Sequence, residues 1–153
     1  MGEAAVVRGE AGEVEAGIRP EDFRAALERA LAEADRDERI GPRLRATRMR
    51  LRFEFPDCGM VLNVAAESDS ELRWAFSDEA DWRPQLELRM DSAVANRYLQ
   101  GRESLAIAIA RGRARCLGSS RVALLCLPAA RLICEPYRRV IEQSFPELVV
   151  PSA

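Results

Sequence analysis

The stretch of residues 85–118 constrains this chain most, because it indicates an unbroken series of secondary-structure elements. Leu86, Leu88 and Met90 alternate with charged residues, which is the period of a strand with one buried face. Asp91 follows directly, and a carboxylate at that position can accept hydrogen bonds from the free N–H groups of a first helical turn. The pattern therefore predicts a strand that runs straight into a helix.

The same stretch continues with a glycine stop, a short apolar helix and a further strand. Gly101 predicts the end of the first helix, because a residue without a Cβ atom adopts the left-handed conformation readily. Residues 105–110 are apolar at every position, and residues 113–117 return to the strand pattern. A helix that is apolar all round is typical of a segment covered on two sides. We therefore expect something besides the sheet to contact it.

Three more predicted strands precede this stretch, at residues 49–55, 60–64 and 72–76. In each of them apolar residues alternate with polar or charged ones. One apolar and one charged face favour an antiparallel sheet with one side on a core and the other in water. The charged side chains should pair across neighbouring strands, and these ion pairs should add little to the stability of the fold. The arginines are Arg48, Arg50 and Arg52, and the expected partners are Glu54, Glu71 and Glu87.

Helices and ends complete the predicted domain, which spans residues 20–143. Pro20 opens a helix with one apolar stripe, and Gly41-Pro42 predicts a break after it. A final helical region begins at Ser119 or Ser120 and extends to about residue 143. Residues 1–19 are predicted to form a flexible tail and residues 144–153 a loosely ordered end.

Composition excludes several classes of function. The chain has 153 residues and is 48% hydrophobic, which indicates one domain with a sizeable core. Its formal net charge of −2 gives no overall attraction to nucleic acid. No segment reaches the roughly 18 apolar residues of a membrane span. Every basic residue is arginine, which indicates the codon bias of a GC-rich, bacterial genome.

The usual chemistry of catalysis and metal binding is also missing from the sequence. The chain has no histidine, which removes the commonest general base and metal ligand. Its cysteines have neither a C-x-x-C pair nor zinc spacing, so we expect buried, reduced thiols in the cytoplasm. The acidic residues 77–81 lack the pattern of a calcium loop. We therefore expect no metal, no cofactor and no enzymatic activity. The cysteines are Cys58, Cys116, Cys126 and Cys134.

The order of these elements resembles that of sterol carrier protein 2-like domains. In that family an alternating strand leads into a helix with an acidic start and a glycine stop. A short helix then precedes a Gly-[Lys/Arg]-x-[Lys/Arg] strand that ends at another glycine. The resemblance covers roughly residues 44–143, and Ser119 departs from the acidic residue frequent there in the family. The matching positions are Asp91, Gly101, Gly112, Arg113, Arg115 and Gly118.

The resemblance implies an α+β domain with a five-stranded, largely antiparallel sheet whose helices cover one face and enclose an apolar cavity. It also implies non-catalytic binding or transfer of a fatty acyl chain, a sterol-like molecule or another lipid. A membrane surface, contacted transiently, and a second copy of the chain are further partners to consider. The residues expected to line the cavity are Phe53, Leu62, Val64, Trp74, Phe76, Leu88, Tyr98, Leu105, Ile107, Ile109, Leu124 and Leu127.

A second hypothesis keeps the same fold and changes the role of its apolar surface. In this alternative, side chains fill the cavity, and the apolar surface binds another protein or forms a homodimer. Trp74 and Phe76 fit ordinary core packing as well as a ligand wall, because aromatic rings dominate both. The helix of residues 105–110 is equally compatible with plain core. An apolar wall has the same sequence pattern whether it faces a ligand or another side chain.

Overall fold

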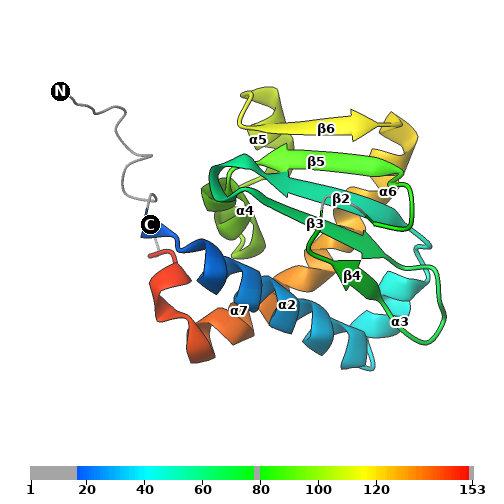
Figure 1. Ribbon diagram of the computed structural model, residues 1–153, viewed down its shortest axis with the longest axis horizontal. Coiled ribbons are helices and arrows are strands. Elements are labelled where there is room, and N and C mark those ends of the chain that lie inside the picture. The colour runs from blue at the N-terminus through cyan, green and yellow to red at the C-terminus, as the bar shows by residue number, and fades with distance from the viewer. Residues whose placement is uncertain (1–16, 78–79, 152–153) are drawn as a thin grey trace.

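A five-stranded sheet in the order β4-β3-β2-β5-β6 forms one layer of the protein, and helices pack against it (Figure 1). The computed structural model describes residues 17–77 and 80–151. The predicted α+β class with helices on one face of the sheet is confirmed. The strands are β2 Arg50–Phe55, β3 Met60–Ala65, β4 Arg73–Ala75, β5 Leu86–Met90 and β6 Ala114–Gly118. The α-helices are α2 Pro20–Arg36, α3 Ile40–Arg45, α4 Ser92–Leu99, α5 Leu105–Ala110, α6 Ser120–Ala130 and α7 Cys134–Ser144. Single 3₁₀ turns are η2 Pro56–Cys58, η3 Arg131–Ile133 and η4 Pro146–Leu148.

The sheet is largely antiparallel, as predicted, with one parallel pair at its centre. β2 and β3 form a hairpin in which Phe55 opposes Met60, and Gly59 between them has a φ of 61°. β2 then pairs in parallel with β5, so that Phe53 lies beside Leu88. Parallel neighbours need a crossover rather than a tight turn. The chain makes this crossover by adding β4 at one edge before it returns to β5.

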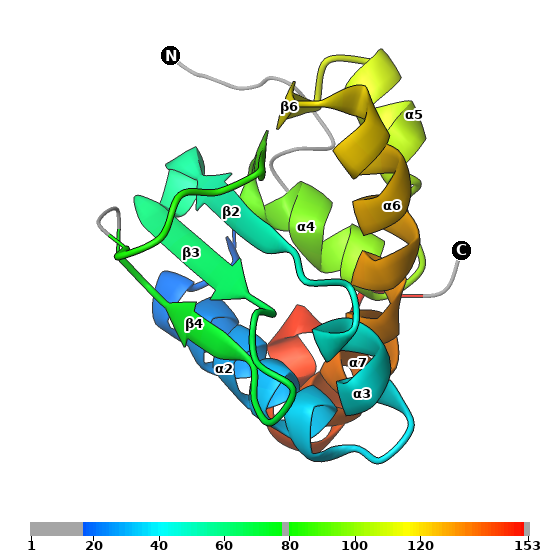
Figure 2. The same ribbon diagram turned by 90° about the vertical axis from the view of Figure 1, so that its right-hand side faces the viewer.

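The two terminal helices lie against each other below the sheet (Figure 2). Phe23 of α2 meets Tyr137 of α7 edge to face, with 6.5 Å between ring centroids, and both side chains are fully buried. Phe23 also contacts Phe55 of β2 at 5.2 Å in the same geometry. Such edge-to-face aromatic pairs add to the area they bury. The aromatic contacts therefore join both ends of the domain to its central strand.

The outer face of the sheet carries the expected lattice of charges, with partners that differ in part. Glu54 forms ion pairs with Arg52, at 3.3 Å, and with Arg89, at 3.6 Å. The Arg50 guanidinium lies 3.6 Å from the Glu67 carboxylate, and Arg48 pairs with Asp69. Glu67 and Asp69 thus take the place of the predicted partners Glu71 and Glu87. Exposed pairs of this kind contribute about 0–1 kcal/mol each. The charged side chains therefore hold this face of the sheet in solvent, while the opposite, apolar face packs against the core.

Two local predictions about helix ends are wrong in detail. Gly41-Pro42 does not break the chain, because both residues lie in the first turn of α3, where a proline costs no hydrogen bond. Asp91 stands at the start of α4, but its side chain makes no capping bond. Asp57 replaces it, since its carboxylate accepts from the backbone N–H of Ser92 at 2.8 Å and from the Ser92 hydroxyl at 2.6 Å. A cap from so distant a position has no local sequence signal.

Helix α5 is covered on one side and not on the two sides predicted from its composition. Leu105 and Ala108 are buried, whereas 50% of the Ile107 surface is exposed. Ile109 lies between these extremes. Of the six residues of α5, Leu105 and Ala108 form the buried row and Ile109 packs partly against the core, while the others face outward. The all-round apolar pattern reflects the many alanines of this helix as much as its environment.

Residues 145–151 are packed, within the stretch 144–153 for which the sequence predicts a loosely ordered end. Leu148 is buried, and its carbonyl accepts from the side-chain amides of Asn96 at 2.9 Å and Gln100 at 2.8 Å. Gln100 in turn accepts from the backbone N–H of Val150 at 2.8 Å. The Tyr137 hydroxyl donates to the amide oxygen of Asn96 at 2.7 Å. This network satisfies buried polar groups that are costly to leave unpaired.

Some predictions fall partly outside the described residues. The predicted tail of residues 1–19 lies outside them up to residue 16, and the predicted acidic turn of residues 77–81 includes residues 78 and 79, which are also outside. Across 17–77 and 80–151, none of the helices has the length and apolar character needed to cross a bilayer.

Candidate ligand-binding cavity

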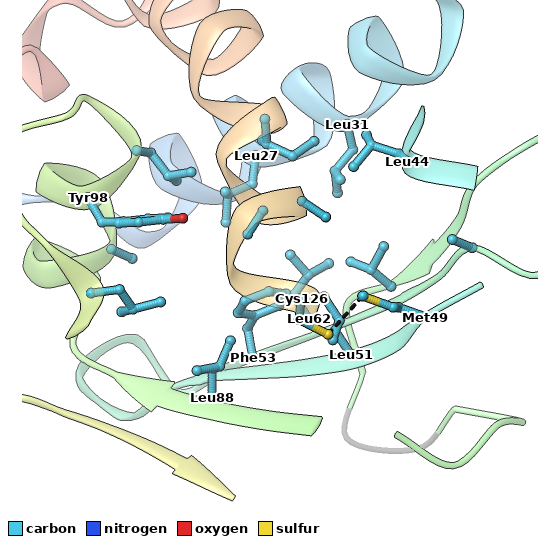
Figure 3. Close-up of a pocket in the computed structure, with 18 of the residues that line it drawn as sticks. Leu27, Leu31, Leu44, Met49, Leu51, Phe53, Leu62, Leu88, Tyr98 and Cys126 are labelled. Carbon is cyan, nitrogen blue, oxygen red and sulfur yellow. Dashed lines mark hydrogen bonds between the residues drawn. The ribbon is translucent and has the colours of Figure 1, made fainter. Parts of the chain in front are cut away.

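An apolar cavity of about 110 Å³ lies between the inner face of the sheet and the helices (Figure 3). Strands β2, β3 and β5 form one wall, and α2 to α6 with η3 form the other. None of the described lining residues is charged. The sheet side is lined by Met49, Leu51, Phe53, Phe55, Leu62, Val64, Ala66, Leu72, Leu88 and Met90. The helix side is lined by Leu27, Leu31, Leu44, Thr47, Ala95, Tyr98, Leu99, Leu105, Cys126, Ala129, Ala130 and Ile133.

Strand register brings the sheet side of this lining together. Phe53 opposes Leu62 across the hairpin and Leu88 across the parallel pair. Side chains directly opposite each other point to the same face of a sheet. The alternation visible in the sequence therefore places one residue from each of three strands in a row under the helices.

Half of the residues predicted for the cavity wall lie in it. The six that line the cavity are Phe53, Leu62, Val64, Leu88, Tyr98 and Leu105. The other six, which the structure places outside the lining, are Trp74, Phe76, Ile107, Ile109, Leu124 and Leu127. Whether the first set binds a ligand stays a prediction, because geometry gives the location of a side chain and not its occupant.

The six outside residues lie on β4, on the segment after it, on α5 and on α6, in different surroundings. Trp74 lies on the edge strand β4 in a shallow surface hollow beside Trp82, and Phe76 lies under the guanidinium of Arg24, 4.7 Å from its ring centroid. Strand parity places Trp74 opposite Val64, and the ring is partly buried against the core cluster of Ala34, Ile40 and Leu44 without lining the cavity. Ile107 is half exposed on the outer side of α5, whereas Ile109 is partly buried against the core. Leu127 packs against the core without reaching the cavity, and Leu124 faces outward.

Sequence reasoning missed the contribution of α6 and η3. Cys126, Ala129, Ala130 and Ile133 line the cavity at positions i, i+3, i+4 and i+7, which is the spacing of one helix face. This period is present in the sequence, but a run rich in leucine and interrupted by Pro128 obscures it. Counting small residues at helical spacing, in place of leucines, would have identified the inner face of α6.

The polar side chains of the lining are few and are placed at its margins. Thr47 donates its hydroxyl hydrogen to the Leu44 carbonyl at 2.6 Å, so that group is satisfied. The Tyr98 hydroxyl points toward the cavity side chains (Figure 3), and within the described part of the chain it has no hydrogen-bond partner. Burial raises the pKa of Tyr98 to about 12, the Cys134 thiol adds to this rise, and Arg131 opposes it. Tyr98 therefore supplies one free, neutral hydroxyl at the end of the cavity near Arg131.

The sulfur atoms of the cavity are packing groups rather than nucleophiles. The Cys126 thiol lies 2.8 Å from the thioether sulfur of Met49, and burial raises the pKa of Cys126 to about 11. Burial also raises the pKa of Cys58, Cys116 and Cys134, and all four cysteines are free. A thiol with a raised pKa is protonated at neutral pH and reacts slowly. Over residues 17–77 and 80–151, no group of acidic or sulfur ligands could hold a metal ion.

The cavity can hold apolar groups by shape and dispersion, and its size sets a limit. A cavity of about 110 Å³ is smaller than the roughly 150 Å³ apolar cavity that takes one benzene molecule. Sites for drug-sized ligands span about 300–1,000 Å³. A lipid chain therefore fits only if part of the wall moves outward. The wall with the smallest inward side chains is α6.

Comparisons with known proteins identify the fold. No protein-family model matches the sequence, and no curated protein matches it. The solved structure of UbiJ-SCP2, a ubiquinone synthesis protein, has a TM-score of 0.55 and 14% identity and covers 76% of this chain and 93% of that one. Sterol carrier protein domain 2 of Helicoverpa armigera also has a TM-score of 0.55, at 12% identity, covering 89% and 98%. Apo sterol carrier protein 2 from Yarrowia lipolytica has the same score at 10% identity, covering 76% and 88%.

These likenesses confirm the predicted sterol carrier protein 2-like fold. At 10–14% identity they establish the arrangement of the chain and nothing finer. Most of each solved chain is covered, so the similarity concerns a whole domain rather than a shared fragment. The ligand and its transfer must be argued from the cavity itself.

Proposed function

We propose that this protein binds the apolar chain of a lipid in the cavity between sheet and helices, without chemical conversion. The observation that carries this proposal is an uncharged, apolar lining that spans both layers of the domain. Apolar side chains held around a void make fewer dispersion contacts than a packed core. A domain that keeps such a void loses stability that an apolar ligand can restore. The carrier function of proteins with this fold supports the same conclusion.

The ligand is an amphipathic lipid whose polar end lies at Tyr98. The Tyr98 hydroxyl is a neutral donor at neutral pH because its pKa is raised to about 12. Arg131 is close enough to influence that pKa and has an exposed side chain. A hydroxyl beside a guanidinium suits the carboxylate of a fatty acid, since charge-assisted hydrogen bonds are the stronger ones. The acyl chain then extends from this end between α6 and the sheet.

Entry of the lipid requires α6 to move. Pro128 has no N–H, so the helix lacks the hydrogen bond that this residue would otherwise donate to the Leu124 carbonyl. On the cavity side α6 presents Cys126, Ala129 and Ala130, which hold it less firmly than large side chains would. Outward displacement of this helix enlarges the cavity and leaves the sheet intact.

No catalytic step is part of the proposal. The cavity contains neither a charged group nor an activated thiol among its described lining residues, and the sequence contains no histidine. The free cysteines suit a reducing compartment, which we take to be the cytoplasm. The rival hypothesis, a protein-interaction module with a closed cavity, predicts that no lipid binds at all.

The test is displacement of a fluorescent fatty-acid probe by unlabelled fatty acids, acyl-CoAs and sterols. Saturable binding is expected, and Ala129→Leu should weaken it at least tenfold because the added side chain fills the cavity. Ala25→Leu is the matched control, since Ala25 is half-buried on α2 outside the lining. Absence of saturable binding across all three ligand classes would contradict the proposal and favour the interaction module.

Tyr98→Phe tests the position of the head group. Loss of one hydrogen bond to a charged group costs about 1.5–3 kcal/mol, so affinity for a fatty acid should fall roughly 10- to 100-fold. Affinity for the methyl ester of the same acid, which has no charge, should change much less. Equal losses for acid and ester would contradict an anionic head group at Tyr98.

A further inference from the structure

The outer face of α6 is apolar and uncovered among the described residues. Leu124 is 75% exposed and Leu125 63% exposed, and both values are far above those of the other leucines on this helix layer. Pro128, one turn after Leu124, is also exposed. The inner face of the same helix lines the cavity through Cys126. A helix that is apolar on both faces is normally covered on both.

The outer face of α6 has a positively charged residue at each end. Arg121 precedes the two leucines and Arg131 follows Pro128, and both arginines are exposed. The ion pairs within the described part of the chain include neither of them. Residues 104–134 contain five arginines and no aspartate or glutamate, in a chain whose formal net charge is −2. The segment that contains α6 therefore carries a net positive charge, whereas the chain as a whole is slightly acidic.

We propose that the outer face of α6 docks on an anionic lipid bilayer. The leucines enter the boundary between head groups and acyl chains, and the flanking arginines reach lipid phosphates. Each arginine near an anionic surface contributes to binding through the surface potential. Docking goes beyond ligand binding, because it requires only the exposed face of α6 and not an open cavity. It also places the movable wall of the cavity against the source of lipid.

A second copy of the chain fits this face less well. In a two-fold interface the same patch meets itself, so Arg121 and Arg131 of one copy would approach those of the other. With no carboxylate on α6 or in residues 104–134, these like charges would have no acidic partner from that segment. An anionic bilayer offers apolar depth and negative charge together. The charge pattern therefore selects the bilayer.

Vesicle flotation of the full chain without added ligand tests the proposal. Protein should float with phosphatidylcholine vesicles containing about one third phosphatidylglycerol, and not with pure phosphatidylcholine. About 0.5 M salt should weaken binding, because it shortens the Debye length to a few ångströms. The cavity need not be occupied, so this result is separate from the outcome of the probe assay.

Matched variants locate the docking face. Arg121→Gln should lower the partition coefficient about fivefold, which corresponds to about 1 kcal/mol. Leu124→Ser combined with Leu125→Ser should lower it more than tenfold. Arg24→Gln makes the same charge change near Phe76, far from α6, and should have little effect. Val149→Ser, at a side chain that is 40% exposed near the C-terminus, controls for loss of an exposed apolar residue.

Three results would overturn the proposal. The first is no flotation with either vesicle. The second is flotation that the α6 variants reduce no more than Arg24→Gln and Val149→Ser do. The third is a dimer, seen by light scattering at working concentration, that the leucine double variant converts to a monomer, since the face would then be covered by a second copy. Circular dichroism and urea midpoints of each variant show that the compared proteins are folded.

Discussion

Helices α5 and α6 are both predominantly apolar and have opposite arrangements of side-chain size. Both are apolar at most positions, and both begin at a serine whose hydroxyl accepts a backbone N–H at 3.2 Å: Ser104 from Ile107, and Ser119 from Arg121. α5 turns the large Leu105 inward and leaves Ile107 half exposed.

α6 does the reverse. It turns small side chains such as Cys126 and Ala129 toward the sheet and exposes Leu124 and Leu125. A large inward side chain fills space and anchors a helix, whereas small ones leave the space open. Both helices contribute to the cavity wall, but the difference makes α5 the firmly anchored part and α6 the part that moves most readily, although their hydrophobicity alone does not separate them.

The largest effect is expected at the anchor of α5. Leu105→Ala should cost about 2–5 kcal/mol of unfolding free energy, and the lower part of that range applies because the new void joins an existing cavity. Ile107→Ala should stay within about 0.5 kcal/mol, since the side chain is half exposed. Urea midpoints of the two variants give the comparison. Similar losses for both would mean that α5 is covered on two sides after all.

The next effect concerns how each helix ends. α5 ends at Gly112 with a φ of 77°, whereas α6 continues into η3 through Arg131 with a φ of −67°. Gly112→Ala should cost about 1 kcal/mol or slightly more, because a Cβ atom disfavours the left-handed region. No atom lies within 4 Å of the added Cβ, so the cost is purely conformational. Arg131→Ala should leave the urea midpoint unchanged. A loss of stability as large as that of Gly112→Ala would mean that the ends of α5 and α6 do not differ in this way.

A smaller effect is expected from removing the caps. Ser104→Ala and Ser119→Ala should each lower stability by about 0.5–1 kcal/mol, as loss of an N-cap usually does. Only Ser119→Ala should also speed release of a bound fatty-acid probe, because it loosens the wall that must move. Stopped-flow displacement measures this rate. Equal release rates in the two variants would contradict α6 as the movable wall.

The smallest effect is a pH dependence that belongs to α6 and not to α5. Burial raises the pKa of Cys126 from 9.0 to about 11, so the folded protein holds this proton more tightly than the unfolded chain. The resulting stability is complete below pH 9 and is lost as pH rises toward 11. Tyr98 adds a similar loss between pH 10 and about 12. Cys126→Ala should flatten the fall of urea midpoints above pH 9, whereas Ile107→Ala should not.

The sequence predicted the sheet better than the cavity, for a physical reason. Period-2 alternation fixes which face of a strand is buried, so Phe53, Leu62 and Leu88 were identified as inward. Trp74 has the same parity and still lies outside the lining, because its strand is at the edge of the sheet. The spatial order of strands depends on distant pairing, such as that of Leu51 with Leu86, which has no local signal.

The helix side was harder to predict because apolar residues there serve two environments. Leu105 and Leu124 were both expected in the cavity wall, and only the first lines it. Helical period identifies a face, but the direction of that face depends on the loop before the helix. The cap that Asp57 supplies to Ser92 shows the same limit, since the two residues are 35 positions apart.

The packing of α2 against α7 has a consequence for synthesis of the chain. Phe23 leaves the ribosome long before Tyr137, and the two rings pack together in the finished domain. At about 5–20 residues per second, the apolar stripe of α2 waits roughly 6–23 s for its partner helix. During that interval the stripe is a natural target for a chaperone that shields exposed apolar segments. The domain therefore completes its helix layer only after α7 has been translated.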